Sequence, residues 1–405
     1  MVVQHRGNRR PGYLLAAGVF AVGMAGTTLP TPLYGLYQAE IGFSELIVTV
    51  VFAVYAVGVI AALLLAGDQS DRVGRRPVIL VALGLSATSD LCFLFQDGLP
   101  LLFVGRLVSG LSAGLLSGAA TAAVLELAPP HRRTRAGFAA TAANLGGVGC
   151  GPLLAGVLAQ YAPEPLHLPF VVHLLLLALA CIPAWLLPET VAHPQRRPRW
   201  HPQGMAVPPE VRGVFPSAAV AAFAGFALLG LFTAVAPSFV AETLDIHDLA
   251  LSGAVTFSAF LASTLGQSLT NRIGARRSLP VGCLTLVVGF LLVGSSLVVE
   301  TLALLLAGAL IGGLGQGLAF RAGLTAVGEA APSEHRGGAI SAFFVVAYAG
   351  IALPVVGVGA LTLALGLRNA GLVFTVVLTV LALGVGLYLL YRPVPDGSTS
   401  TDGSA

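Results

Sequence analysis

The chain has 405 residues, of which 56% are hydrophobic and only 10% are charged. Its net charge of +3 comes from 21 basic side chains, all of them arginine, against 18 acidic ones. A water-soluble domain must cover its surface with polar groups and carries roughly 25% charged residues. The composition therefore excludes a soluble enzyme, and it predicts a chain that lies mostly in lipid.

Twelve segments are long and apolar enough to cross a membrane as helices. A helix needs about 20 residues for this, because each residue advances about 1.5 Å across about 30 Å of hydrocarbon. We expect the first segment to be an uncleaved span rather than a secretory signal. The sequence thus predicts an all-α integral membrane protein with 12 transmembrane helices. They centre on residues 13–36, 45–66, 77–96, 100–125, 136–160, 168–187, 214–238, 250–270, 279–298, 301–327, 338–361 and 369–390.

The arginines are distributed unevenly over the connections between these spans. With the N-terminus inside the cell, 18 arginines face the inside, Arg368 faces the outside, and Arg106 and Arg321 lie within spans. Short loops rich in arginine stay on the cytoplasmic side of a membrane. We therefore expect a multi-pass protein of the cytoplasmic membrane with both termini in the cytoplasm.

The two halves of the chain resemble each other. Residues 114–136 align without gaps on residues 317–339, and ten of the 23 positions are identical. The letters DRVGRR at 71–76 likewise match NRIGAR at 271–276. A duplicated six-helix unit predicts two pseudo-symmetric bundles around a midplane site, which is an architecture of secondary transporters. The predicted parts are a cytoplasmic N-terminal segment (1–12), a six-helix bundle (13–188), a cytoplasmic linker (189–213), a second six-helix bundle (214–391) and a disordered cytoplasmic tail (392–405).

The connection after the second span carries the letters GDQSDRVGRRPVI at 67–79. This connection resembles the signature loop of major facilitator superfamily transporters. Together with the half-repeat, the resemblance to this family covers nearly the whole chain. Gln69 stands where the family has an aliphatic residue. The resemblance implies a latch that joins span 2 to span 11, whereas the residues alone also allow charges that only fix topology. The implied gating residues are Gly67, Asp71, Arg72, Gly74, Arg75, Arg76 and Glu126.

Two further segments resemble motifs of the same family. GRLVSGLSAG at 105–114 resembles its membrane-embedded arginine motif, with Arg106 in place and Ser109 instead of the usual glutamine. GVGCGPLLAG at 147–156 resembles a motif of exporters that exchange drug for proton. A glycine and proline there weaken the helix, so this segment is either a hinge or a generic packing surface. The matching positions are Gly147, Gly151, Pro152 and Gly156.

Few ionisable side chains lie inside the predicted spans. Asp90 and Arg106 both sit roughly 10 Å below the outer surface, on neighbouring antiparallel spans. They are our candidates for proton coupling, and the alternatives are a static ion pair or two unrelated positions. His173 is expected to be an interface residue rather than a proton relay. Arg321 belongs to one half only, which indicates either recognition of an anionic or carbonyl group or a side chain that extends to the inner surface.

In similar proteins, spans 1, 4, 7 and 10 line the substrate cavity. Aromatic faces with few hydrogen-bonding groups suit a moderately hydrophobic small molecule, although aromatic side chains inside a bundle also serve as packing. The cavity candidates are Thr28, Tyr34, Asn144, Phe226, Phe232, Gln316, Phe320, Arg321 and Tyr348.

The predicted function is secondary active transport by alternating access, with proton-coupled efflux of a small molecule. An uptake symporter or a uniporter for a metabolite is the alternative within the class, and a membrane sensor or enzyme is the alternative outside it. The absence of lysine excludes a Walker-type nucleotide loop. We expect no cofactor, no metal site and no nucleic-acid partner. The expected partners are the substrate, protons and the lipid bilayer, and we expect a monomer.

Overall fold

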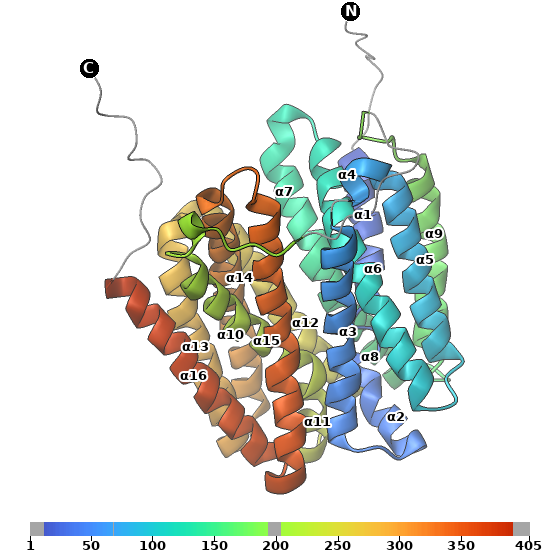
Figure 1. Cartoon of the computed structure of the whole chain (residues 1–405). Coiled ribbons are helices and arrows are strands. Elements are labelled where there is room, and N and C mark those ends of the chain that lie inside the picture. The colour runs from blue at the N-terminus through green and yellow to red at the C-terminus, as the bar shows by residue number, and fades with distance from the viewer. Residues whose placement is uncertain (1–11, 68, 193–203, 392–405) are drawn as a thin grey trace, which may run out of the picture.

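The computed structural model describes residues 12–67, 69–192 and 204–391, which form a bundle of helices that run side by side (Figure 1). The predicted N-terminal segment and tail, at 1–11 and 392–405, lie outside the described residues, and so does the middle of the predicted linker, at 193–203. Across the described ranges the regular structure is entirely helical. The all-α fold that the sequence predicts is therefore confirmed.

Eleven helices within the described ranges are long and apolar enough to cross a membrane, and Gly12–Ala25 is a shorter apolar helix. They occupy the positions of the twelve predicted spans. In the first half, the elements are α1 (Gly12–Ala25), η1 (Thr31–Leu33), α2 (Tyr34–Ile41), α3 (Glu45–Ala66), α4 (Gln69–Val73), α5 (Arg75–Leu94), α6 (Leu99–Glu126), η2 (Pro130–Arg132), α7 (Arg133–Thr141), η3 (Ala142–Gly146), α8 (Gly147–Tyr161) and α9 (Leu168–Leu186). In the second half, they are η4 (Pro209–Val211), α10 (Phe215–Ala234), α11 (Ala236–Ser238), η5 (Phe239–Thr243), α12 (Leu249–Ile273), α13 (Ala275–Val299), α14 (Leu302–Ala330), α15 (Arg336–Leu365) and α16 (Leu367–Tyr391).

The first span is not the continuous helix over 13–36 that the sequence predicts. Its helix α1 ends at Ala25, turns follow, and the short helices η1 and α2 complete the span. Pro30 and Pro32 lack the N–H groups that a continuing helix would use, and their rings clash with the preceding turn. Backbone carbonyls near the break are therefore free, and inside a membrane such groups must find partners in the protein.

The fifth span contains a second irregularity, but its helix continues through it. Residues 142–146 form a π-helical turn between α7 and α8, and Pro152 lies inside α8. A proline in a helix leaves the carbonyl four residues earlier without its donor. That carbonyl belongs to Val148, and it accepts a hydrogen bond from the hydroxyl of Thr28 at the break in the first span.

The two halves pack against each other along two pairs of helices, α3 with α15 and α8 with α12. Glycines bring both pairs into close contact toward the end of the bundle where α2 and α11 are found, opposite the loop at 67–76 (Figure 1). A Cβ on Gly359 would overlap the side chain of Thr49 across this interface. At the same end, the hydroxyl of Ser238 donates to Glu45 at 2.8 Å.

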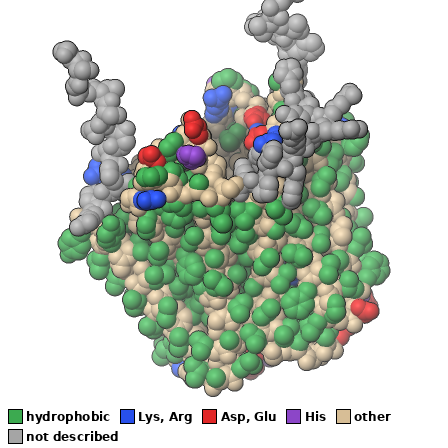
Figure 2. All heavy atoms as spheres, in the orientation of Figure 1, with side chains coloured by type: hydrophobic (Ala, Val, Ile, Leu, Met, Phe, Trp, Pro, Cys, Tyr) green, Lys and Arg blue, Asp and Glu red, His purple; other side chains and the backbone are tan. Residues whose placement is uncertain are grey.

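Apolar side chains cover the sides of the bundle. Figure 2 shows hydrophobic side chains over most of this face, with charged side chains gathered at the upper end. Exposed leucines and valines lie on outer helices, such as Leu175 and Leu179 on α9 and Val376 and Val380 on α16. This apolar surface is the one that the sequence predicts for contact with lipid.

Candidate functional site

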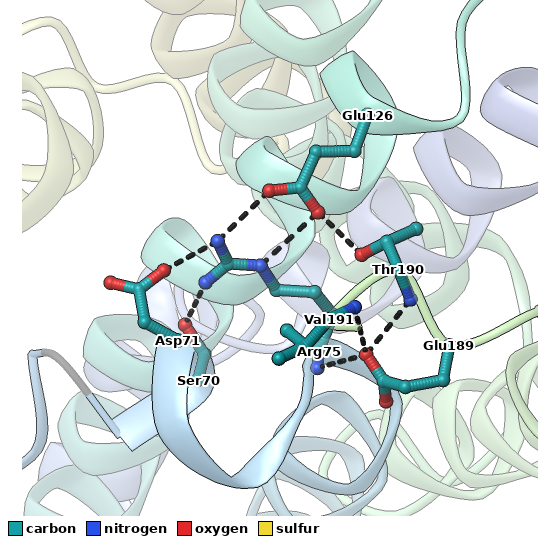
Figure 3. A network of polar contacts seen from close by, with 7 residues as sticks. All are labelled: Ser70, Asp71, Arg75, Glu126, Glu189, Thr190 and Val191. Atoms are coloured by element: carbon teal, nitrogen blue, oxygen red, sulfur yellow. Dashed lines mark hydrogen bonds and ion pairs between the residues drawn. The ribbon is translucent and has the colours of Figure 1, made fainter. Parts of the chain in front are cut away.

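Arg75 lies at the centre of a polar network in the loop after the second span (Figure 3). Its Nη2 lies 2.5 Å from Asp71 and 2.9 Å from Glu126, its Nε donates to Glu126 at 3.3 Å, and its Nη1 donates to Ser70 at 2.7 Å. The guanidinium is thus held by two carboxylates and one hydroxyl. A planar fork of fixed donors can make these contacts together, which the single ammonium group of a lysine cannot.

Glu189, just after α9, binds backbone groups of the same loop. Its carboxylate accepts the N–H groups of Arg75 at 2.9 Å and Arg76 at 3.2 Å, at the first turn of α5. It also accepts the N–H groups of Thr190 and Val191 (Figure 3). An anion is stabilised at a helix N-terminus, where backbone N–H groups have no helical partner. From its position in the chain, Glu189 could be recognised only as a residue that follows the last apolar residues of span 6.

Gly74 makes the turn into α5 possible. Its φ of +117° belongs to a region that favours glycine, and a Cβ there would overlap the Glu189 carboxylate. Gly274 has a φ of +86° at the same place of the repeat. The charged residues are not repeated, because Asn271 and Ala275 stand where the first half has Asp71 and Arg75. The network therefore belongs to one half only.

The other predicted residues of the loop lie around this network. Gly67 ends α3, and Arg72 lies in the short helix α4. The guanidinium of Arg76 lies over the ring of Trp185 at 4.7 Å. Asp71, Arg75 and Glu126 are thus brought together within the first half, and the latch to span 11 stays a prediction.

Arg106 is buried inside the first half, with 1% of its surface exposed. Its Nη1 donates to the carbonyl oxygen of Thr27 at 2.5 Å, in the break of the first span. Its guanidinium lies over the rings of Tyr55 at 4.7 Å and Phe52 at 5.4 Å. Its Nε and Nη2 have no hydrogen-bond partner among the described residues, and the same holds for the nearby hydroxyl of Tyr34.

The structure pairs Asp90 with His173, not with Arg106. His173 Nδ1 lies 2.6 Å from Asp90 Oδ2, and both side chains are buried. His173 Nε2 lies 2.9 Å from the carbonyl oxygen of Val22, near the end of α1. His173 is thus fully buried inside the bundle, and its depth relative to the membrane interface stays a prediction. The pairing was missed because spacing along the chain does not tell which faces of two distant helices meet.

The glycines of the 147–156 motif lie at close contacts on two sides of α8. A Cβ on Gly147 or Gly151 would overlap the backbone of α1, near Ala21 and Ala25. A Cβ on Gly156 would overlap the carbonyl oxygen of Leu249, in the other half. Pro152 in turn lies against Gly253 of α12. The structure thus places this motif between the broken first span and the second half.

Three of the predicted cavity residues form an aromatic cluster. The ring of Phe226 on α10 lies 5.1 Å from that of Phe320 on α14 and 5.5 Å from that of Tyr348 on α15. Phe343 and Phe344 extend the cluster around Phe320. The hydroxyl of Tyr348 faces that of Tyr55, so the cluster reaches the boundary with the first half.

The remaining cavity candidates have different surroundings. Gln316 is buried and accepts a hydrogen bond from Ser263, so it links α14 to α12. Phe232 is fully buried in the core of the second half. Asn144 lies in the π-helical turn of span 5, where it is partly buried. Arg321 is exposed on α14, one residue from Phe320.

The described residues hold no group of three or more histidine, cysteine or acidic side chains that could bind a metal ion. A narrow apolar pocket lies between α10, α13, α14 and α16, and Leu231, Val235 and Leu297 are among its lining residues. None of the predicted cavity residues lines it.

The sequence matches the model of the Major Facilitator Superfamily over residues 15–266 and 218–405. A class D tetracycline resistance protein of Salmonella ordonez is 29% identical over 150 residues, which are 37% of either chain. Quinolone resistance protein NorA of Staphylococcus aureus is 22% identical over 149 residues, which are 36% of this chain and 38% of NorA. The matches thus span little more than a third of the length of these curated relatives.

Two solved structures resemble the whole fold. One is a bacterial homologue of the human lysosomal transporter Spinster, described as inward-facing and unoccupied, with a TM-score of 0.74 at 15% identity. It covers 96% of this chain and 100% of that one. The other is the human organic anion transporter MFSD10, with a TM-score of 0.64 at 19% identity, over 93% of this chain and 100% of that one.

Proposed function

Because the chain belongs to the Major Facilitator Superfamily, and is thus a membrane transporter rather than an enzyme, we propose that it exports a small, moderately hydrophobic molecule in exchange for protons. The protein works as a monomer in the cytoplasmic membrane, with both termini in the cytoplasm. The names of its relatives, resistance to tetracycline and to quinolones, support efflux. The arginine-rich loops support the orientation.

The aromatic cluster of the second half carries this proposal. Phe226, Phe320 and Tyr348 come from three different helices, and Tyr348 meets Tyr55 of the first half. A flat or hydrophobic molecule at the boundary between the halves would contact ring faces and two hydroxyl groups. Ring faces bind through dispersion and burial of apolar surface, which tolerates different substrates, while the hydroxyls orient polar groups.

The contacts between the halves support alternating access from an inward-facing state. Ser238 with Glu45 and Leu249 with Gln160 hold the halves together at the end away from the signature loop. The arginine distribution assigns that end to the outside. With the outer end closed, a substrate enters from the cytoplasm, as export requires. The Spinster homologue, which is described as inward-facing, has the same overall fold.

Transport in proteoliposomes tests this function. The purified protein is reconstituted, a pH gradient is imposed, and uptake of tetracycline, ethidium and benzoate is measured in each direction. We expect tetracycline or ethidium to move against its gradient when protons flow the opposite way. Accumulation of a probe along with an inward proton flow would instead indicate an uptake symporter, and equal movement without a pH gradient would indicate a uniporter.

A matched pair of substitutions tests the role of the cluster. Phe320→Ala removes the central ring and should lower transport by at least ten-fold. Phe290→Ala removes a ring of the same size from the core of the same half, where Phe290 packs on Phe374. It should affect stability and leave the apparent affinity for the probe unchanged. If both variants change affinity alike, the cluster does not bind the substrate.

A further inference from the structure

The buried pair Asp90–His173 has no role in the function described so far. Asp90 lies on α5 and His173 on α9, and both side chains are at most 1% exposed. A buried acid and base that contact each other inside a transporter are a candidate proton site. We propose that Asp90 and His173 together bind the proton that the transporter exchanges for its substrate. This inference rests on the proposed function, because it assigns the coupling site of the same transport cycle.

The hydrogen bonds of the pair fix how many protons it holds. The carbonyl oxygen of Val22 can only accept, so His173 Nε2 must carry a hydrogen to bond with it at 2.9 Å. His173 Nδ1 and Asp90 Oδ2 lie 2.6 Å apart, and two groups at that distance need a hydrogen between them. Whether this proton belongs to the imidazole or to the carboxyl, the pair is neutral and holds one exchangeable proton.

Loss of that proton would leave the imidazole with one hydrogen for two acceptors, the Asp90 carboxylate and the carbonyl oxygen of Val22. One nitrogen of His173 would then present a lone pair to an oxygen, and that contact would become repulsive. The pair would also carry one negative charge in a medium where an unpaired charge is costly. Release of the proton therefore requires His173 or Asp90 to change its contacts.

Arg106 is the cation nearest to Asp90 in register. The hydroxyl of Ser89 donates to the carbonyl oxygen of Gly105 at 2.8 Å, and these residues directly precede Asp90 on α5 and Arg106 on α6. Arg106 has two N–H positions, on Nε and Nη2, without a partner among the described residues. An ionised Asp90 that turned from His173 toward α6 on proton release would find a cation there.

No other charged group of the packed helices lies at this level. The helices around the pair are α1, α6 and α8, besides α5 and α9 themselves. Arg106 alone of their charged residues is near Asp90 in register. The other titratable residues on or between these five helices are Tyr13, Arg75, Arg76, Cys92, Asp97, Glu126, Cys150, Tyr161, Glu164, His167 and Cys181. The arginines, Glu126 and Tyr13 lie at the signature-loop end, while Asp97, Tyr161, Glu164 and His167 lie at the opposite end.

The broken first span connects this site to the substrate path. His173 contacts the carbonyl oxygen of Val22 just before the break, and Arg106 donates to the carbonyl oxygen of Thr27 within it. A Cβ on Gly26 would lie 2.5 Å from His173 Cε1, so the ring packs directly on the break. A change in the contacts of His173 would therefore act on this segment, next to Thr28 and Tyr34.

Proteoliposomes with Asp90→Asn and His173→Gln test the proposal. Both variants should lose transport of tetracycline or ethidium driven by a pH gradient by at least ten-fold, and both should keep exchange of the probe without a gradient. Asp97→Asn and His247→Gln are the matched controls, because these side chains are exposed outside the bundle, and both should transport like the wild type.

The outcomes separate the two proposals. If the wild type responds to the pH gradient and both variants respond equally well, the pair is not the coupling site, while proton-coupled export stands. If the wild type itself does not respond, proton coupling fails, and the assignment of the pair fails with it.

A measurement on the intact pair decides the case if the variants do not fold. In a chain where the other seven histidines are replaced by glutamine, ¹⁵N-labelled His173 is observed by NMR while the pH is changed. We expect the ¹⁵N signals of the imidazole to report the loss of one proton from the pair within the pH range over which transport changes. A proton that stays on the pair throughout that range would overturn the proposal.

Discussion

Gly253 of α12 lies against the carbonyl oxygen of Pro152 in α8, so that the two halves of the transporter meet backbone to backbone. A Cβ on Gly253 would overlap this oxygen. Close approach of this kind between membrane helices needs small residues, because their attraction depends on van der Waals contact. In the transport cycle proposed above, this contact lies on the closed side and breaks when that side opens.

We predict that Gly253→Leu favours the state in which the outer side is open. Overpacking of a tight contact costs about 1–3 kcal/mol, which shifts an equilibrium between two conformations by roughly 5- to 150-fold. Labelling of a cysteine introduced at Thr49, on the closed interface, should become faster. Gly384→Leu is the control, because Gly384 has open space around its Cα. Unchanged labelling in Gly253→Leu would contradict the closed-side assignment.

Arg75→Lys should lower both stability and transport. A lysine keeps the charge but cannot reach Asp71, Ser70 and both oxygens of Glu126 together, so contacts worth about 1–3 kcal/mol are lost. The apparent melting temperature in detergent and the transport rate measure the effect. Arg135→Lys is the control, since Arg135 is exposed on α7. If Arg75→Lys behaves like Arg135→Lys, the network does no more than fix topology.

Gly26→Ala should reproduce the transport defect of His173→Gln. The new methyl group would lie 2.5 Å from His173 Cε1 and 2.8 Å from Ser86 Oγ, so the imidazole must move away from Asp90. Transport driven by a pH gradient should fall while exchange without a gradient continues. Gly18→Ala adds the same methyl group to α1 where it meets nothing within 4 Å. A normal pH-driven rate in Gly26→Ala would show that the ring position is not critical.

Thr28→Val should destabilise the protein only while Pro152 is present. The Thr28 hydroxyl satisfies the Val148 carbonyl that Pro152 leaves free, and an unsatisfied buried carbonyl costs about 1–3 kcal/mol. Pro152→Ala restores the N–H donor of the helix to Val148. Thermal unfolding of both single variants and the double variant forms a cycle. Equal losses from Thr28→Val in the two backgrounds would show that the hydroxyl does not compensate for the proline.

The contacts of the signature loop were only partly predictable. The glycine turn and the charges of residues 67–76 could be recognised from the sequence, and the structure brings Asp71, Arg75 and Glu126 together. Glu189, which holds the first turn of α5, lies more than 100 residues away along the chain, and its place in the sequence does not tell which loop it contacts. Pro30 and Pro32 indicate the break in the first span, but we predicted one continuous helix because the segment is long and apolar.

Local patterns along the chain were enough to predict the class of fold, the positions of the spans and the family motifs. These follow from the local run of apolar residues and from the order of arginines along the chain, because a lipid environment acts on each segment separately. Which faces of the helices meet could be learned only from the folded chain. Asp90 pairs with His173, 83 positions further along, and Thr28 compensates for Pro152, because the rotation of each helix depends on packing against all its neighbours at once.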